Sequence, residues 1–166
     1  MPAKSIPLRG AVDAIAGVTA AVASGALGAL VLVLAWQVIG RYVLNASPSW
    51  TEPVALTLMG IAALFGAALA VRSESHFSFP TLVETAPPAV RTALRALARF
   101  IAFAFGLALS GFGFFLMASE WDTPMAGAAA PEGVAFAGIA FGGALIAIFA
   151  LERLFTGAPP AAAKAE

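Results

Sequence analysis

The sequence predicts an all-α membrane protein with four transmembrane helices, and two observations lead to that prediction. Hydrophobic residues make up 61% of the 166 residues and charged residues 11%, against roughly 45–50% and about 25% in typical soluble domains. Four runs also lack any charged side chain, namely residues 14–40, 53–71, 100–119 and 133–151. A helix needs about 20 residues to cross a hydrocarbon core of roughly 30 Å, so each run is long enough to span once.

A soluble bundle of four buried helices is the alternative. Each helix of a soluble bundle presents a stripe of polar residues to water. None of the four runs contains a stripe of charged residues. Lipid accepts an apolar surface of this extent, whereas water does not. The sequence therefore predicts one four-helix transmembrane domain over residues 1–156. The remaining residues, 157–166, are small or proline-rich and predict a disordered cytoplasmic tail.

The first run, residues 14–40, follows a short basic segment and so has the outline of a signal peptide. It exceeds the roughly 7–15 residues of a signal-peptide core, which favours a retained membrane helix. Asn45 and Pro48 supply turn chemistry that ends this helix. Thr51 is expected to cap the second helix, and Glu52 lies favourably near its positive end.

The loop after the second run contains three prolines that exclude an unbroken helix, Pro80, Pro87 and Pro88. We expect short interfacial helical segments in this second loop and in the first loop. Three arginines then recur four residues apart and form a candidate lipid-headgroup face: Arg91, Arg95 and Arg99. This helix is expected to begin at the cytoplasmic surface and to run into the third span, with its arginines reaching lipid phosphates.

Small residues recur within the spans at spacings that let helices approach closely in lipid. Gly138 and Gly142 form a GxxxG pattern in the fourth run, and Ala21 and Gly25 have the same spacing in the first. These patterns fit packing within the chain and contact with a partner subunit almost equally well.

Basic residues are distributed unevenly between the two sides of the predicted domain. Eight of the nine fall on one side, namely Lys4, Arg9, Arg72, Arg91, Arg95, Arg99, Arg153 and Lys164. The other side holds Arg41 together with an acidic loop that carries Glu120, Asp122 and Glu132. Cytoplasmic loops carry an excess of Lys and Arg, so both termini and the second loop are predicted to be cytoplasmic.

The spans offer little that could perform chemistry. Transporters and pumps usually carry ionisable groups deep within their spans, whereas here Asp13, Glu52, Glu120 and Glu152 all fall at span ends where water or headgroups reach them. His76 is the single histidine and there are no cysteines, so no cofactor and no metal site is expected. No nucleophile–base pair is recognisable, so an enzyme is not expected. The net charge of zero offers no field that favours nucleic acid.

Residues 41–76 combine polar and aromatic features that the rest of the chain lacks. The combination consists of Arg41-Tyr42, Asn45, Trp50-Thr51-Glu52, Gly66-Ala67-Ala68-Leu69-Ala70-Val71-Arg72, and His76. In this order and topology it resembles the small membrane subunit (DctQ type) of tripartite ATP-independent periplasmic (TRAP) transporters. The family's usual acidic and basic residues are replaced here by Pro53 and Leu56, which bears on charged contacts at those positions but not on the fold.

The resemblance implies a scaffold in the bacterial or archaeal inner membrane rather than a solute carrier. It implies a large membrane subunit that moves a small organic anion with a sodium gradient, and a periplasmic binding protein that delivers it. Within that assembly the motif residues would contact the other subunits: Arg41, Tyr42, Asn45, Trp50, Glu52, Arg72 and His76. Two alternatives remain open, the small subunit of a tricarboxylate-type tripartite importer and a small homo-oligomeric exporter.

Overall fold

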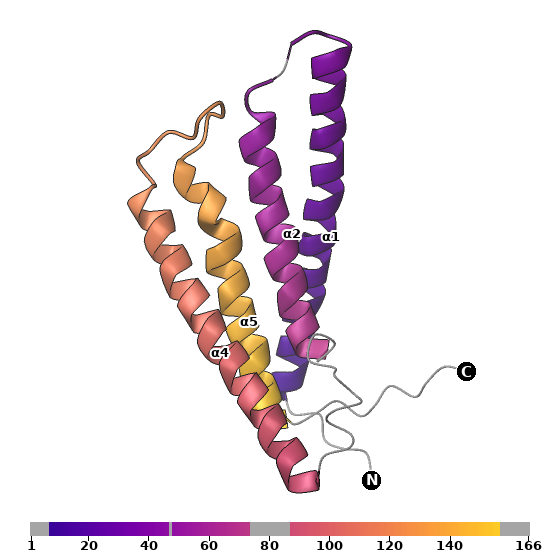
Figure 1. Ribbon diagram of the computed structural model, residues 1–166, viewed down its shortest axis with the longest axis vertical. Helices are drawn as coiled ribbons and strands as arrows, with labels where there is room; N and C mark the ends of the chain where they lie inside the picture. The colour runs from indigo at the N-terminus through magenta and orange to yellow at the C-terminus, as the bar shows by residue number, and fades with distance from the viewer. Residues whose placement is uncertain (1–6, 47, 74–86, 157–166) are drawn as a thin grey trace, which may run out of the picture.

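The computed structural model describes residues 7–46, 48–73 and 87–156, which form four long α-helices and one short 3₁₀ helix (Figure 1). The long helices are α1 (Pro7–Tyr42), α2 (Thr51–Ser73), α4 (Pro88–Ser119) and α5 (Ala137–Thr156), and the 3₁₀ helix η2 (Glu132–Phe136) leads directly into α5. All four spans are long and apolar enough to cross a membrane. The prediction of an all-α protein with four spans is confirmed.

The helices are arranged as two hairpins, α1 with α2 and α4 with α5 (Figure 1). Helix α5 lies between α4 and α2, and α1 packs along the far side of α2. The hairpins come together at the end where α2 and α5 finish. There the buried core joins α1, α2 and α5 through Ala16, Ala68, Ile146 and Phe149.

Glycines bring α4 and α5 into backbone contact. A Cβ atom on Gly113 would lie 2.5 Å from the backbone nitrogen of Ala140, and one on Gly106 would lie 2.6 Å from that of Ala147. In lipid there is no hydrophobic force that drives helices together, because the lipid tails are themselves apolar. Close packing of this kind is therefore one of the interactions that hold membrane helices together. The α4–α5 hairpin therefore depends on positions where no side chain fits.

The GxxxG pattern of α5 packs against α2 of the same chain. A Cβ on Gly138 would meet the backbone of Gly60 in α2 at 2.7 Å, and one on Gly142 would meet Leu64 Cβ at 2.5 Å. The interpretation of this pattern as a contact with a partner subunit is therefore wrong. In α1 the situation differs, because a Cβ on Gly25 has nothing within 4 Å among the described residues.

The interfacial helix predicted in the first loop is not found among its described residues. The described residues of the first loop, 43–46 and 48–50, form turns rather than a helix, because Asn45 adopts a left-handed conformation with φ 51° and reverses the chain. The second loop lies mostly outside the described residues, so the helix expected there stays a prediction. A short helix that the sequence did not predict, η2, lies in the third loop. The helix that carries the three arginines does run unbroken from Pro88 to Ser119, as predicted.

Candidate functional site

The first loop is fixed by buried backbone contacts. The Thr51 hydroxyl is fully buried and donates to the Pro48 carbonyl at 2.8 Å. Thr51 is thus the first residue of α2, and its hydroxyl points back into the loop instead of capping the helix, contrary to the prediction. Gly40 permits the tight return, because a Cβ there would lie 2.9 Å from the Ala46 carbonyl oxygen.

The third loop folds back on itself and then lies against the first. An antiparallel bridge joins Pro124 to Pro131, and the side chain of Met125 is buried beneath the loop. Ser49 Oγ donates to the Gly127 carbonyl at 3.3 Å. Gly127 has φ 83°, and a Cβ there would lie 2.5 Å from the Ser49 carbonyl oxygen. The two loops, residues 43–46 and 48–50 of the first and 120–131 of the third, therefore form one surface, here called the loop platform.

The predicted contact residues at this end surround the loop platform with exposed side chains. Five of the seven are exposed, Arg41, Tyr42, Asn45, Trp50 and Glu52. Within the described residues, none of these side chains makes a hydrogen bond or an ion pair. Their polar groups are thus not required to hold this chain together, which leaves them available to a partner.

The same end of the molecule is acidic and aromatic. It carries Glu120, Asp122 and Glu132 of the third loop and η2. Trp121 is exposed beside them, at a position where an aromatic ring suits the membrane–water interface.

At the opposite end, Arg72 joins three helices. Its Nε donates to Glu152 Oε2 in α5 at 2.9 Å, its Nη2 donates to Glu152 Oε1 at 3.3 Å, and Nη2 also contacts Asp13 Oδ1 in α1. Arg153 Nε donates to the Arg72 carbonyl at 2.6 Å. That carbonyl is in the last turn of α2, where backbone acceptors have no partner within the helix. These four residues form the Arg72 network.

The sequence alone did not find this network. The sequence predicts that Asp13 and Glu152 are solvated at the span ends, but the Glu152 side chain is only 12% exposed because it lies against Arg72. The contact of Arg72 with another subunit stays a prediction, and within this chain its guanidinium pairs with Asp13 and Glu152. One feature of the sequence could have indicated the network. The predicted topology places Asp13, Arg72 and Glu152 at the same end of the bundle.

The predicted lipid-headgroup face lies on the α5 side of α4. Steps of four and seven residues stay on one side of a helix, so Arg91, Arg95 and Arg99 follow the same side as Gly106 and Gly113. Because Gly113 meets Ala140 and Gly106 meets Ala147, the antiparallel register carries Arg95 past the end of α5. Arg91 and Arg95 therefore lie beyond the end of α5, and Arg99 lies beside its last turn. His76, the other predicted site residue, is outside the described residues.

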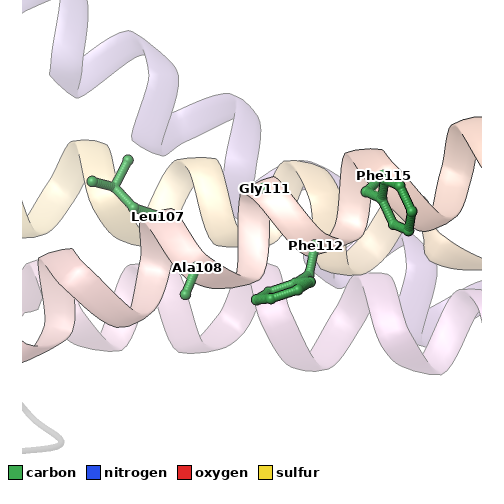
Figure 2. Close-up of a pocket in the computed structure, with 5 residues that line it drawn as sticks. All are labelled: Leu107, Ala108, Gly111, Phe112 and Phe115. Carbon is green, nitrogen blue, oxygen red and sulfur yellow. The ribbon is translucent and has the colours of Figure 1, made fainter.

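A shallow concavity lies on the other side of α4 (Figure 2). Its volume is about 420 Å³, and α4 alone lines it, with Leu107, Ala108, Gly111, Phe112 and Phe115. None of these side chains carries a charge or a hydrogen-bonding group. The concavity therefore suits an apolar neighbour and has no group that could orient a polar solute.

Within the described residues, no group of three or more His, Asp or Glu side chains could hold a metal ion. Charged side chains of the described spans lie in their end portions, as Arg41, Glu52 and Arg72 do. The fold and these sites define a four-helix integral membrane protein with polar groups at its two ends and apolar helices between them.

The family model for the DctQ component of tripartite ATP-independent periplasmic transporters matches residues 30–159. The chain belongs to this family. It is therefore a small permease subunit of a TRAP transporter, a multi-pass protein of the inner membrane and not an enzyme. This match decides against the small subunit of a tricarboxylate-type importer.

A relative in the same family is the sialic acid TRAP transporter small permease protein SiaQ of Vibrio cholerae serotype O1. The two chains are 32% identical over 68 residues, which is 41% of this chain and 39% of the relative. The alignment thus spans well under half of either protein, and it supports the family assignment without carrying over a substrate.

Proposed function

We propose that this chain is an accessory scaffold subunit of a TRAP-type importer. It packs against a large solute-translocating membrane subunit and helps to dock a periplasmic binding protein, and the assembly takes up a small organic anion with a sodium gradient. The observation that carries this proposal is the distribution of charge. The middle portions of the described spans hold no ionisable side chain, so another subunit must supply the groups that bind solute and sodium.

The loop platform is the surface that we propose for the binding protein. The excess of Lys and Arg at the opposite end supports a periplasmic position for the platform. Ser49 and Gly127 hold the two loops together, so the surface is fixed before a partner arrives, and a fixed surface loses less entropy on binding. Its acidic residues favour a binding protein that presents basic side chains.

For the substrate we propose an organic acid, such as a dicarboxylate or a related compound. The name of SiaQ associates that protein with sialic acid, which is itself a carboxylic acid. Selectivity within this class would lie in the large subunit and the binding protein, because the middle portions of the described spans hold no ionisable side chain that could bind a carboxylate.

The arginine row of α4 is the part that we propose for contact with membrane lipids. Arg95 is exposed and lies beyond the last residue of α5, at the end where the basic residues predict the cytoplasmic surface. Anionic phosphates attract clustered basic side chains at such a surface. Contact there would set the depth of α4 in the bilayer.

Reconstitution tests the proposed function directly. This chain is purified alone and together with a large TRAP membrane subunit, and each preparation is placed in liposomes with an inward sodium gradient. Uptake of a radiolabelled organic acid is then measured with the binding protein outside. We expect uptake only from the complete set, and we expect the large subunit to co-purify with this chain.

Transport by this chain alone would contradict the proposal and favour the small exporter. Glu52→Gln separates these two functions further. Proton-coupled export would stop without this carboxylate, whereas a scaffold retains uptake or loses it only together with co-purification of the large subunit.

Gly127→Val tests whether the fixed loop platform matters for docking. A β-branched residue at φ 83° is strained by about 1–3 kcal/mol, and its Cβ would collide with the Ser49 carbonyl, so the third loop should separate from the first. We expect binding-protein-dependent uptake to fall while co-purification with the large subunit is kept. Ala126→Val, at the exposed neighbouring position, is the control. Equal uptake by both variants would show that the contact between the loops is irrelevant to docking.

A further inference from the structure

The Arg72 network has one sheltered side and one exposed side. Arg72 and Glu152 make a two-point ion pair between α2 and α5, and their side chains are 19% and 12% exposed. Asp13, which contacts the same guanidinium from α1, is 67% exposed. Water and salt therefore reach the link to α1 far more easily than the link to α5.

Arg72 does not need Asp13 to keep its position. Its guanidinium carbon lies 5.6 Å from the centre of the Phe149 ring, which is fully buried in α5. Arg153, also in α5, donates to the Arg72 carbonyl. Together with Glu152, these contacts join α2 to α5 without any contribution from α1.

Near the Arg72 network, α1 packs through small and medium-sized side chains. Ala16 is its member of the buried core cluster, and Val12 packs against that cluster while still partly exposed. Both side chains are small or medium in size, so they bury little apolar area. Within its described side chains, α1 makes one ion pair, that of Asp13 with Arg72.

We propose that Asp13 and Arg72 form a releasable latch between α1 and the rest of the bundle. When the Asp13 carboxylate leaves, the amino-terminal half of α1 moves away from α5, and Arg72 stays with Glu152. The closed arrangement, with Asp13 on Arg72, and the open arrangement, without that contact, are both populated. Their ratio depends on the strength of this one exposed ion pair. The latch lets α1 adjust to a neighbouring membrane protein without dismantling the contact between α2 and α5.

Spin-label distances test the latch. The chain has no cysteine, so labelled cysteines can be introduced in pairs at exposed positions, Val18→Cys with Phe155→Cys for α1–α5 and Ala63→Cys with Ile148→Cys for α2–α5. Double electron–electron resonance is recorded on the full chain in nanodiscs. With Asp13→Asn, we expect the α1–α5 distribution to broaden and to shift to longer distances, while the α2–α5 distribution stays unchanged.

Salt gives a second measurement that leaves the network intact. Near 1 M salt the Debye length is about 3 Å, so the labelled chain with Asp13 should move toward the Asp13→Asn distribution. The Asp13→Asn chain itself should not respond to salt. Asp122→Asn, which neutralises an exposed carboxylate of the third loop, is the matched control and should change neither distance.

Two results would overturn the latch. The first is an α1–α5 distribution that responds neither to Asp13→Asn nor to salt, since α1 would then be held by packing alone. The second is an equal change in the α2–α5 distribution, because Asp13 would then be holding the whole bundle and not one helix.

Discussion

Gly113→Leu is expected to separate α4 from α5 and to destabilise the protein more than any other single change proposed for it. A Cβ at this position would lie 2.5 Å from a backbone nitrogen of α5, and backbone cannot move aside as the end of a flexible side chain can. Overpacking usually costs about 1–3 kcal/mol and sometimes more. We expect about 3 kcal/mol here, because the whole leucine side chain must be accommodated between two helices.

Gly111→Leu is the matched control, since it places the same side chain on the same helix two residues away. A Cβ at Gly111 has nothing within 4 Å among the described residues, because this glycine lines the concavity on the other side of α4. Thermal unfolding of the isolated chain in detergent compares the two variants. Similar melting temperatures would mean that α4 and α5 do not meet at Gly113.

Arg72→Met is expected to have the second largest effect. Methionine preserves length and apolar packing beside Phe149 but removes the charge that accompanies Glu152. Breaking a buried ion pair by removing one partner costs about 3–5 kcal/mol. We expect about 2–3 kcal/mol, because both side chains keep some exposure and salt and water screen them in part.

One further variant separates charge from geometry at Arg72, and a second, at Arg41, serves as the control. Arg72→Lys keeps the charge but loses the planar fork that reaches both oxygens of Glu152, so an intermediate loss of stability is expected. Arg41→Met removes the exposed arginine in the last turn of α1 and should cost less than about 1 kcal/mol. Unfolding in a denaturing detergent series measures all three variants. Equal loss at Arg41 and Arg72 would contradict a structural role for the network.

Much of the fold could be read along the chain. The four spans, the turn at Asn45 and the unbroken helix after Pro88 all follow from short stretches of sequence. These features depend on local chemistry, namely the transfer of apolar side chains into lipid and the backbone preferences of a few residues. Two local predictions are wrong, namely that Thr51 caps α2 and that the first loop contains a helical segment. There the backbone turns tightly against Gly40, and such a contact is not encoded by residue type alone.

One part of the candidate site could be predicted from the sequence and another could not, again because only local features are visible along the chain. The exposed residues around the loop platform were recognised because Arg41, Trp50 and Glu52 lie close together in the sequence. The Arg72 network was missed because Arg72 is 59 residues from Asp13 and 80 residues from Glu152. No periodicity connects residues at such separations.

The four membrane spans, and the position of the charged residues at the ends of those spans, follow from the amino-acid sequence without any tertiary information. Hydrophobicity adds up along each segment, so one segment is enough to determine whether it enters lipid. Three contacts become visible only in the folded bundle: Gly138 and Gly142 meet α2, Ser49 meets the third loop, and Arg72 pairs with Asp13 and Glu152. These contacts depend on how one helix is rotated and shifted against another, and that register is fixed by the packing of all four helices together.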